Sequence, residues 1–281
     1  MIVLADSQYG KAEVRLLRVC RDKDAAGADA HRLRDLNVTI ALSGDLAATH
    51  LTGDNSAVLT TDAQKNTVYA FAAEHGCGEI EDFAVLLATH FVTSQPAIST
   101  ARVSIDEYGW DAVGGTGHSF ARSGGETRTA AVTIGGRTAT IESGLRGLVL
   151  LNTAGSEFGG FVRDRYTTLP ETTDRILATE VNASWQHTAS GIRWAESYLT
   201  ARTLLIDAFA QTYSYSLQQT LFAMGRTLLA GLTEIAEVHL SLPNKHHFDV
   251  DLSPFGLDST HEVYFPSDRP YGLIEGTVRR A

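Results

Sequence analysis

Hydrophobic and polar side chains alternate along several short segments of this chain, and such alternation is typical of half-buried β-strands. In the first segment, Val14 and Leu16 alternate with Lys11, Glu13 and Arg15. Lys11 is therefore predicted to lie on the face opposite Val14. The pattern predicts strands over residues 9–21, 35–42, 98–110 and 128–134, and again over residues 138–151, 176–185, 237–242, 262–265 and 273–278.

Between these strands, hydrophobic residues recur every three or four positions, which predicts amphipathic helices. Two helices are predicted to begin at Thr61 and near Ile80, and two more near Tyr198 and at Leu217. Thr61 and Ser216 each stand three residues before a glutamine, which is the spacing of a capping box. Two helix starts are therefore marked by their capping residues as well as by periodicity.

The order strand, strand, helix, helix, strand, strand occurs twice along the chain. This predicts an α+β fold of two tandem ββααββ units, residues 1–135 and 136–281, with the turn at Gly135–Gly136 between them. Each unit is expected to form an antiparallel four-stranded sheet with its helix pair on one face. The other face then needs cover, and packing against another subunit is the usual cover.

Composition narrows the class of protein. The chain has 281 residues, 43% of them hydrophobic and 20% charged, which suits a soluble globular protein with a large core. A formal net charge of −10 argues against a nucleic-acid partner or a membrane surface. No apolar run is long enough for a membrane span, and no signal peptide is evident. The two cysteines, Cys20 and Cys77, are expected to be free thiols, so a cytoplasmic enzyme or binding protein is expected.

The densest candidate chemistry lies in residues 241–248, SLPNKHHF, directly after a predicted strand. Here Asn244, Lys245, His246 and His247 place an amide, an ammonium and two imidazoles side by side. Together they supply hydrogen-bond donors, acceptors and a group that titrates near neutrality. The alternative is a polar loop with incidental histidines.

A second polar segment, residues 60–67, opens a predicted helix. Thr61 and Asp62 would simply cap that helix and favour its dipole, or its free N–H groups would hold an anion with the Thr61 hydroxyl aimed at it. Lys11 is either one polar residue of a strand or the partner of Thr61 in removing a proton. The second role requires burial to lower the pKa of its ammonium.

A third segment, residues 152–175, is too long for an ordinary connection and too aromatic for a disordered one. Phe158, flanked by small residues, would offer a flat face to a planar ligand, and Arg175 a rigid fork for adjacent acceptors. Gln218 would form an opposing jaw, or else be an exposed amide. The alternative for Arg175 is an ion pair with Asp164, Glu171 or Asp174.

Together these segments resemble the urate oxidase (uricase) family over nearly the whole chain and in the family's order. The matching stretches are residues 9–16 (YGKAEVRL), 35–45 (DLNVTIALSGD), 53–56 (GDNS), 61–72 (TDAQKNTVYAFA), 118–120 (HSF), 155–158 (GSEF), 166–179 (YTTLPETTDRILAT), 217–220 (LQQT), 241–248 (SLPNKHHF) and 268–278 (DRPYGLIEGTV). The resemblance implies the tunnelling fold (T-fold), in which the sheets of a homotetramer form a barrel-like tunnel. It also implies a purine-degrading oxidoreductase that oxidises urate with O₂ to 5-hydroxyisourate and H₂O₂, with no cofactor and no metal.

The family's functional residues fall on intact positions. The resemblance implies a proton relay of Lys11, Thr61 and His246. It implies substrate contacts by Thr61, the backbone N–H groups of Asp62 and Leu217, Phe158 as the stacking face, Arg175 and Gln218 as two jaws, and Asn244 holding O₂ or water above the ring. In the family, Lys11, Thr61 and Asp62 act across a subunit interface.

The chain departs from the family pattern at four positions. A lysine is expected at Asn152, a bulkier residue at Gly159, an acidic residue at Arg165 and a histidine near Thr116. The last residues, Arg279-Arg280-Ala281, lack a Ser-Lys-Leu peroxisomal signal, so a cytoplasmic location is expected.

Two alternatives to urate oxidation stay open on the sequence. One is another purine- or pterin-processing enzyme of the same fold, using zinc held by His90, His118, His246 or His247. The other is a catalytically silent relative that binds purines.

Overall fold

The computed structural model describes residues 2–136, 138–258 and 261–281. Contacts within the chain divide it into two compact units, Met1–Gly144 and Leu145–Ala281, called here the first and the second unit. The predicted boundary between Gly135 and Gly136 falls in the turn that ends one strand and precedes the next, and it stays a prediction.

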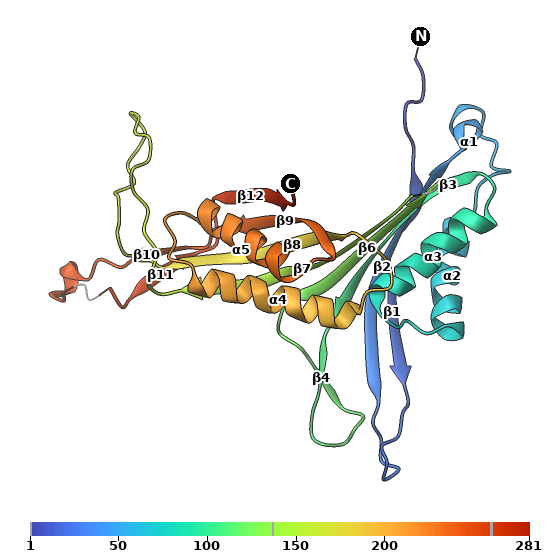
Figure 1. Ribbon diagram of the computed structural model, residues 1–281, viewed down its shortest axis with the longest axis horizontal. Coiled ribbons are helices and arrows are strands. Elements are labelled where there is room, and N and C mark those ends of the chain that lie inside the picture. The colour runs from blue at the N-terminus through green and yellow to red at the C-terminus, as the bar shows by residue number, and fades with distance from the viewer. Residues whose placement is uncertain (1, 137, 259–260) are drawn as a thin grey trace. The chain divides into compact units, whose positions relative to one another are not determined.

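The first unit is an antiparallel sheet with helices on one face (Figure 1). The strand order is β1-β2-β3-β6-β7. α3 buries Ile80, Phe83, Leu87 and Phe91, at the three- and four-residue steps seen in the sequence. The elements are β1 (Tyr9–Cys20), β2 (Arg32–Gly44), α1 (Ala47–Leu51), α2 (Thr61–Glu74), α3 (Ile80–Ser94), β3 (Ile98–Tyr108), β4 (Trp110–Ala112), β5 (Phe120–Arg122), β6 (Thr127–Gly135) and β7 (Thr138–Asn152), whose last part belongs to the second unit.

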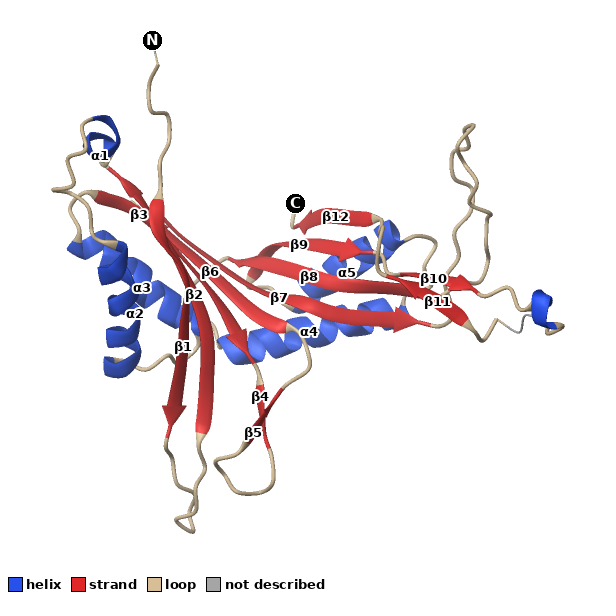
Figure 2. Ribbon diagram, turned by 180° about the vertical axis from the view of Figure 1, so that it is seen from behind, coloured by secondary structure: helices blue, strands red, loops and turns tan. Residues whose placement is uncertain are grey.

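The second unit repeats this plan. Its strands follow the order β7-β8-β9-β12, and α4 and α5 cover one face, which lies behind the strands in Figure 2. Its core gathers Trp185, Leu205 and Met224 among other buried side chains. The elements are β8 (Leu177–His187), α4 (Trp194–Gln211), α5 (Leu217–Gly231), β9 (Ile235–Pro243), β10 (His246–Asp249), the 3₁₀ turn Ser253–Phe255, β11 (Tyr264–Ser267) and β12 (Leu273–Arg279).

The predicted α+β class and the repeated ββααββ order are confirmed, with local corrections. The strand predicted over residues 98–110 ends at Tyr108, and Trp110 opens a separate short strand. Four short elements were not predicted: α1, β5, β10 and the 3₁₀ turn Ser253–Phe255. Within the described residues, no helix is long and apolar enough to cross a bilayer.

The predicted facing of Lys11 is wrong because β1 contains a bulge. Lys11 pairs with Ile40 and Val14 pairs with Val38, so β1 advances three residues where β2 advances two. Within the bulge Glu13 has φ +56°, in the left-handed region. Residues paired across strands share a face of the sheet, and Ile40 and Val38 are on the buried, helix-covered face. Lys11 therefore lies on the same face as Val14.

Candidate active site

In the second unit, the loop between β7 and β8 brings an arginine over a phenyl ring. The guanidinium carbon of Arg175 lies 5.1 Å from the centroid of Phe158, and Phe161 stacks on Phe158 at 5.0 Å. The backbone of Phe158 exchanges two hydrogen bonds with Thr172, at 2.8 and 3.1 Å, which fixes the ring on the loop. The predicted flat face and fork are thus brought together.

Arg175 has no carboxylate partner among the residues that the structure describes. Of the predicted partners, Glu171 instead pairs with Arg163 at 3.5 Å, and Asp164 accepts hydrogen bonds from its own loop. The Nε of Arg175 donates to the hydroxyl of Ser156 at 3.1 Å, which is a neutral partner. Burial alone lowers the pKa of Arg175. A half-buried cation without a counter-ion favours an anionic ligand.

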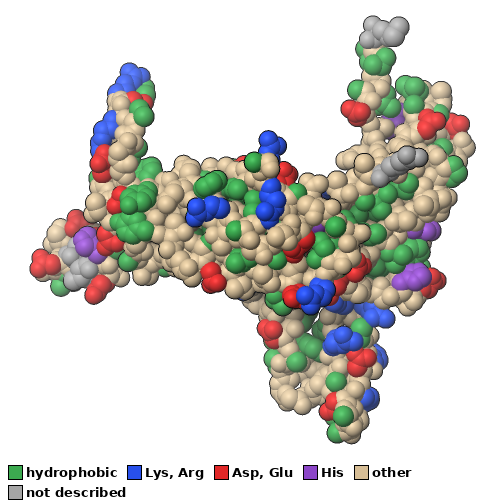
Figure 3. Space-filling model, in the orientation of Figure 1, with side chains coloured by type: hydrophobic (Ala, Val, Ile, Leu, Met, Phe, Trp, Pro, Cys, Tyr) green, Lys and Arg blue, Asp and Glu red, His purple; other side chains and the backbone are tan. Residues whose placement is uncertain are grey.

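The same loop carries exposed positive charge. Its tip projects from the second unit, and Figure 3 shows Lys or Arg side chains along this arm, at the upper left. Arg163 and Arg165 are exposed there. The arm also carries Asp164 and Glu171, and Glu171 pairs with Arg163, so these charges balance within the arm.

Residues 244–247 lie where β9 ends and β10 begins. The N–H of Asn244 donates to the carbonyl of Gly272 at 2.8 Å, which fixes the turn. Lys245 pairs with Glu180 at 3.1 Å, a supporting role. The pKa of His246 is lowered by burial and then by the positive charges of Arg175 and His247. His246 is therefore neutral and able to accept a proton at neutral pH.

The start of α5 confirms its predicted cap. The Ser216 hydroxyl accepts from the N–H of Gln219 at 3.2 Å, and the Gln219 side chain accepts from Tyr215 N–H at 2.9 Å. Leu217 and Gln218 are the first two helical residues, whose N–H groups have no acceptor within the helix. The Gln218 side chain is exposed.

The remaining predicted residues lie in the first unit, at the start of α2. The cap there is Thr60, whose hydroxyl accepts from Ala63 N–H at 3.1 Å, so the prediction that Thr61 caps the helix is wrong. Thr61 is instead the first helical residue. Lys65 pairs with Asp62 at 2.6 Å and, with a weaker contribution from Lys11, lowers the pKa of that carboxyl.

The structure thus places the predicted residues in two groups. Lys11, Thr61 and Asp62 gather in the first unit, while Phe158, Arg175, Asn244, His246 and the start of α5 belong to the second. Among described residues, the Lys11 ammonium and the Thr61 hydroxyl share no hydrogen bond.

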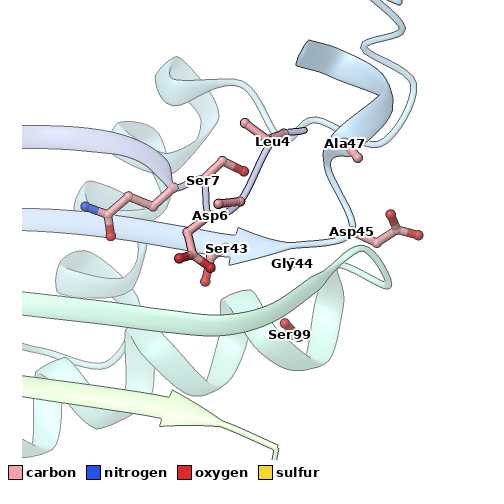
Figure 4. A pocket seen from close by; sticks show the side chains of 10 residues that line it. Leu4, Asp6, Ser7, Ser43, Gly44, Asp45, Ala47 and Ser99 are labelled. Carbon is pink, nitrogen blue, oxygen red and sulfur yellow. The ribbon is translucent and has the colours of Figure 1, made fainter. Parts of the chain in front are cut away.

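A hollow in the first unit is unsuited to an anionic substrate. A hollow of about 570 Å³ in the first unit is lined by residues 4–8, 43–45, 47 and 99 and contains no predicted site residue (Figure 4). It carries Asp6 and Asp45, which would repel an anion.

In the described ranges, no three His, Cys, Asp or Glu side chains gather as a metal site would require, so the zinc alternative has no ligand set there.

Comparison with known proteins decides the family. The family model described as Uricase matches residues 7–133 and 141–275. The chain belongs to the uricase family. It is 47% identical to the uricase of Arthrobacter globiformis over 279 residues, covering 99% of this chain and 90% of that protein. The uricase of Aspergillus flavus is 36% identical, covering 100% of this chain and 98% of that one.

Solved uricase structures share the fold. The crystal structure of the Arthrobacter globiformis uricase matches with a TM-score of 0.95 at 48% identity, covering 100% of this chain and 96% of that chain. A urate oxidase structure from Bacillus sp. TB-90 matches with a TM-score of 0.81 at 26% identity, covering 98% and 100%. The predicted family and fold class are confirmed.

The four departures from the uricase pattern have local roles in this chain. Asn152 donates to the carbonyl of Phe209 at 3.1 Å, near the end of α4. A Cβ at Gly159 would lie 3.3 Å from a carboxylate oxygen of Glu171, so a bulkier residue would press on that side chain. Arg165 hydrogen-bonds Tyr166, and Thr116 accepts from His118 N–H at 3.4 Å. None replaces a residue of the two groups.

Ser156, the buried serine that contacts Arg175, was not among the predicted site residues. Ser156 lies within the GSEF stretch, but a serine in a polar loop carries no signal of burial. Its contacts are with Arg175, 19 positions away, and Ser214, 58 positions away, and they form only in the folded chain.

Proposed function

We propose that this chain catalyses the oxidation of urate by O₂ and water to 5-hydroxyisourate and H₂O₂. Membership of the uricase family carries the reaction class. The single observation that carries the site is the half-buried, uncompensated guanidinium of Arg175 over the face of Phe158. Urate is planar and anionic, so a ring face and a free cationic fork match both of its properties.

The proposed roles divide between recognition and proton transfer. Arg175 and Gln218 contact the edge of urate, and Phe158 stacks on its plane. The free N–H groups of Leu217 and Asp62, at two helix starts, suit anionic acceptors. Excluding water around the ring strengthens each of these contacts.

Proton removal raises the electron-donating power of urate, so that it passes electrons to O₂ directly, without a metal or flavin. In this proposal Lys11, Thr61 and His246 move protons, and Asn244 places O₂ against the ring. A neutral His246 is in the state needed to accept a proton. Loss of peroxide from C5 and addition of water complete the products.

We further propose that Lys11, Thr61 and Asp62 of one subunit complete the site of another in a homotetramer. Exposed apolar side chains support an assembly: Phe248 and Phe265 face one another on β10 and β11, at 53% and 62% exposure. The uncovered sheet faces would line the tunnel.

Free Cys20 and Cys77 suit a reducing, cytoplasmic location.

One assay tests the reaction. The purified protein is mixed with urate in a chelator-containing buffer, and urate absorbance and peroxide are followed together. Equal loss of urate and gain of peroxide are expected. Urate loss without peroxide, or activity abolished by the chelator, would contradict the mechanism, and binding without turnover would favour a silent relative.

The relay has its own test. Lys11→Met and Thr61→Ala should each lower turnover roughly 100-fold or more while the assembly stays intact by size-exclusion chromatography. A double variant that turns over at the full rate would rule the relay out.

A further inference from the structure

The serine under Arg175 is one of three buried hydroxyl residues that link Arg175 to the start of α5 in the second unit. Ser156 is 1% exposed, and Ser214 and Thr220 are fully buried. The Ser156 hydroxyl accepts from Arg175 Nε at 3.1 Å, and the Ser156 carbonyl accepts from the Arg175 N–H at 3.1 Å. Arg175 is thus held to this serine at both its backbone and its side chain.

Through Ser214, Ser156 is also linked to the start of α5. Ser156 and Ser214 form a parallel bridge, and hydrogen bonds of 2.8 and 2.9 Å tie Ser214 to the flanking Glu157 and Gly155. The Ser214 hydroxyl donates to the carbonyl of Ser216, the cap of α5, at 3.1 Å and accepts from the Thr220 hydroxyl at 2.8 Å. The loop that carries Phe158 and the helix that carries Gln218 therefore rest on one support.

A hydroxyl at this position does what a carboxylate could not. An acceptor on Nε fixes the plane of the guanidinium and leaves both Nη groups to a ligand. Because the acceptor is neutral, the positive charge stays available to that ligand. A buried hydroxyl held at 1% exposure also cannot exchange this bond for water.

We propose that Ser156 is a positioning residue for substrate recognition, which holds Arg175 in the orientation that contacts urate, and that Ser214 couples it to the start of α5. The proposal rests on the proposed function. Ser156 touches no reacting atom and acts through Arg175 alone.

The test separates binding from turnover. Urate affinity is measured without O₂, by titration, and kcat and KM with O₂, for the full-length protein and for Ser156→Ala. Loss of one hydrogen bond predicts a roughly 3- to 10-fold rise in Kd and KM, with kcat changed less than KM. If Ser156→Ala folds badly, Ser156→Cys replaces it in the test. The thiol keeps the volume of the side chain but accepts a hydrogen bond poorly, so this variant should show the same rise in Kd and KM.

A double variant shows whether the effect passes through Arg175. Lysine has no Nε donor in that position, so Ser156→Ala added to Arg175→Lys should leave Kd unchanged from Arg175→Lys alone. Ser197→Ala is the matched control. Ser197 is a buried serine near the start of α4, and its hydroxyl donates to a carboxylate oxygen of Glu234 at 3.0 Å. The substitution should lower thermal stability and leave Kd unchanged.

The outcomes distinguish the two proposals. Wild-type turnover with an unchanged Kd in both Ser156 variants would overturn the positioning role and leave the reaction standing. An equal loss of affinity on the Arg175→Lys background would also overturn it, because the effect would then be merely structural. A wild-type protein that binds no urate would refute the proposed function, and the positioning role with it.

Discussion

Arg128 in the first unit and Arg175 in the second are two shielded arginines with opposite surroundings. Arg128 contacts Glu81 at 2.8 Å, Glu79 at 2.9 Å and Glu107 at 3.6 Å. Arg175 contacts a serine hydroxyl and a phenyl ring. Burial alone would lower the pKa of either group, but the carboxylates around Arg128 outweigh burial and raise its pKa, whereas the pKa of Arg175 is lowered.

In the proposed site, this difference separates an arginine that stabilises the fold from one that binds substrate. The charge of Arg128 is already neutralised within the fold, so it has nothing to offer a ligand. The charge of Arg175 is left without a counter-ion, which costs folding energy unless a ligand supplies one. Burial by itself does not distinguish the two, and the identity of the neighbours does.

The largest expected effect is on catalysis at Arg175. Arg175→Met keeps an apolar stem over Phe158 and removes the charge, so the proposed charge-assisted hydrogen bonds to urate would be lost. We expect kcat/KM to fall by roughly 100-fold or more, with little change in the thermal unfolding midpoint. A variant that keeps wild-type kcat/KM would show that Arg175 does not contact the substrate.

The reverse outcome is expected at Arg128. Arg128→Met leaves the fully buried Glu81 without its cation, so the unfolding free energy should fall by about 3–5 kcal/mol. Urate KM of the folded fraction should stay at the wild-type value. Thermal unfolding measures the first effect and steady-state kinetics the second.

Arg102→Met is the control for that experiment. Its ion pair with Glu142 spans 3.3 Å between side chains 48% and 38% exposed, so its loss should cost under about 1 kcal/mol. Equal destabilisation by the two variants would contradict the contrast between a buried and an exposed pair.

The second unit also buries a titratable group in its neutral form. His187, at 7% exposure, packs edge-on against Trp194 at 5.0 Å, and burial lowers its pKa to about 4 against the opposing charge of Glu234. The unfolded chain, with a pKa near 6.5, binds the proton first. Stability should therefore fall as pH falls from 6.5 to 4, by up to about 3 kcal/mol.

His187→Gln removes this titration. Unfolding midpoints of wild type and variant, measured from pH 7 to 4.5, should converge as the pH falls. Parallel curves would mean that His187 titrates alike in the folded and unfolded chain.

The smallest effect is a shift in the pH profile of turnover. Because the pKa of His246 is lowered, the acid limb of kcat/KM should lie below pH 6.5, with activity lost as His246 gains a proton. His247→Gln removes one of the repelling charges and should move that limb to higher pH. A shift to lower pH would contradict the proposed role of His246.

Long segments with a regular hydrophobic period were predictable from the sequence. Which of two adjacent residues caps a helix, and where a very short strand lies, were not. Hydrophobic spacing located α3 and α5 because their buried residues recur over several turns. The cap of α2 was misplaced by one residue because Thr60 and Thr61 have the same side chain, and only backbone geometry selects Thr60. The strand β10 was missed since its four residues show no alternation.

The candidate site was predictable in its parts and not in its grouping. The residue types at Phe158, Arg175 and His246 indicated stacking, anion binding and proton transfer. Their proximity depends on contacts between segments far apart in the chain, as does the neutral partner of Arg175. Spacing along the chain carries no information on either.

The bulge in β1 decides which deletions in this strand keep Lys11 on its present face. Removing one residue between Lys11 and Val14 would restore regular pairing and leave Lys11 opposite Ile40, on the helix-covered face. Removing two residues would leave Lys11 and Val14 adjacent in a regular strand and turn Lys11, with Tyr9 before it, to the opposite face. Deletion of Ala12 alone should therefore lower urate turnover much less than deletion of both Ala12 and Glu13. Equal losses from the two deletions would show that the facing of Lys11 does not matter.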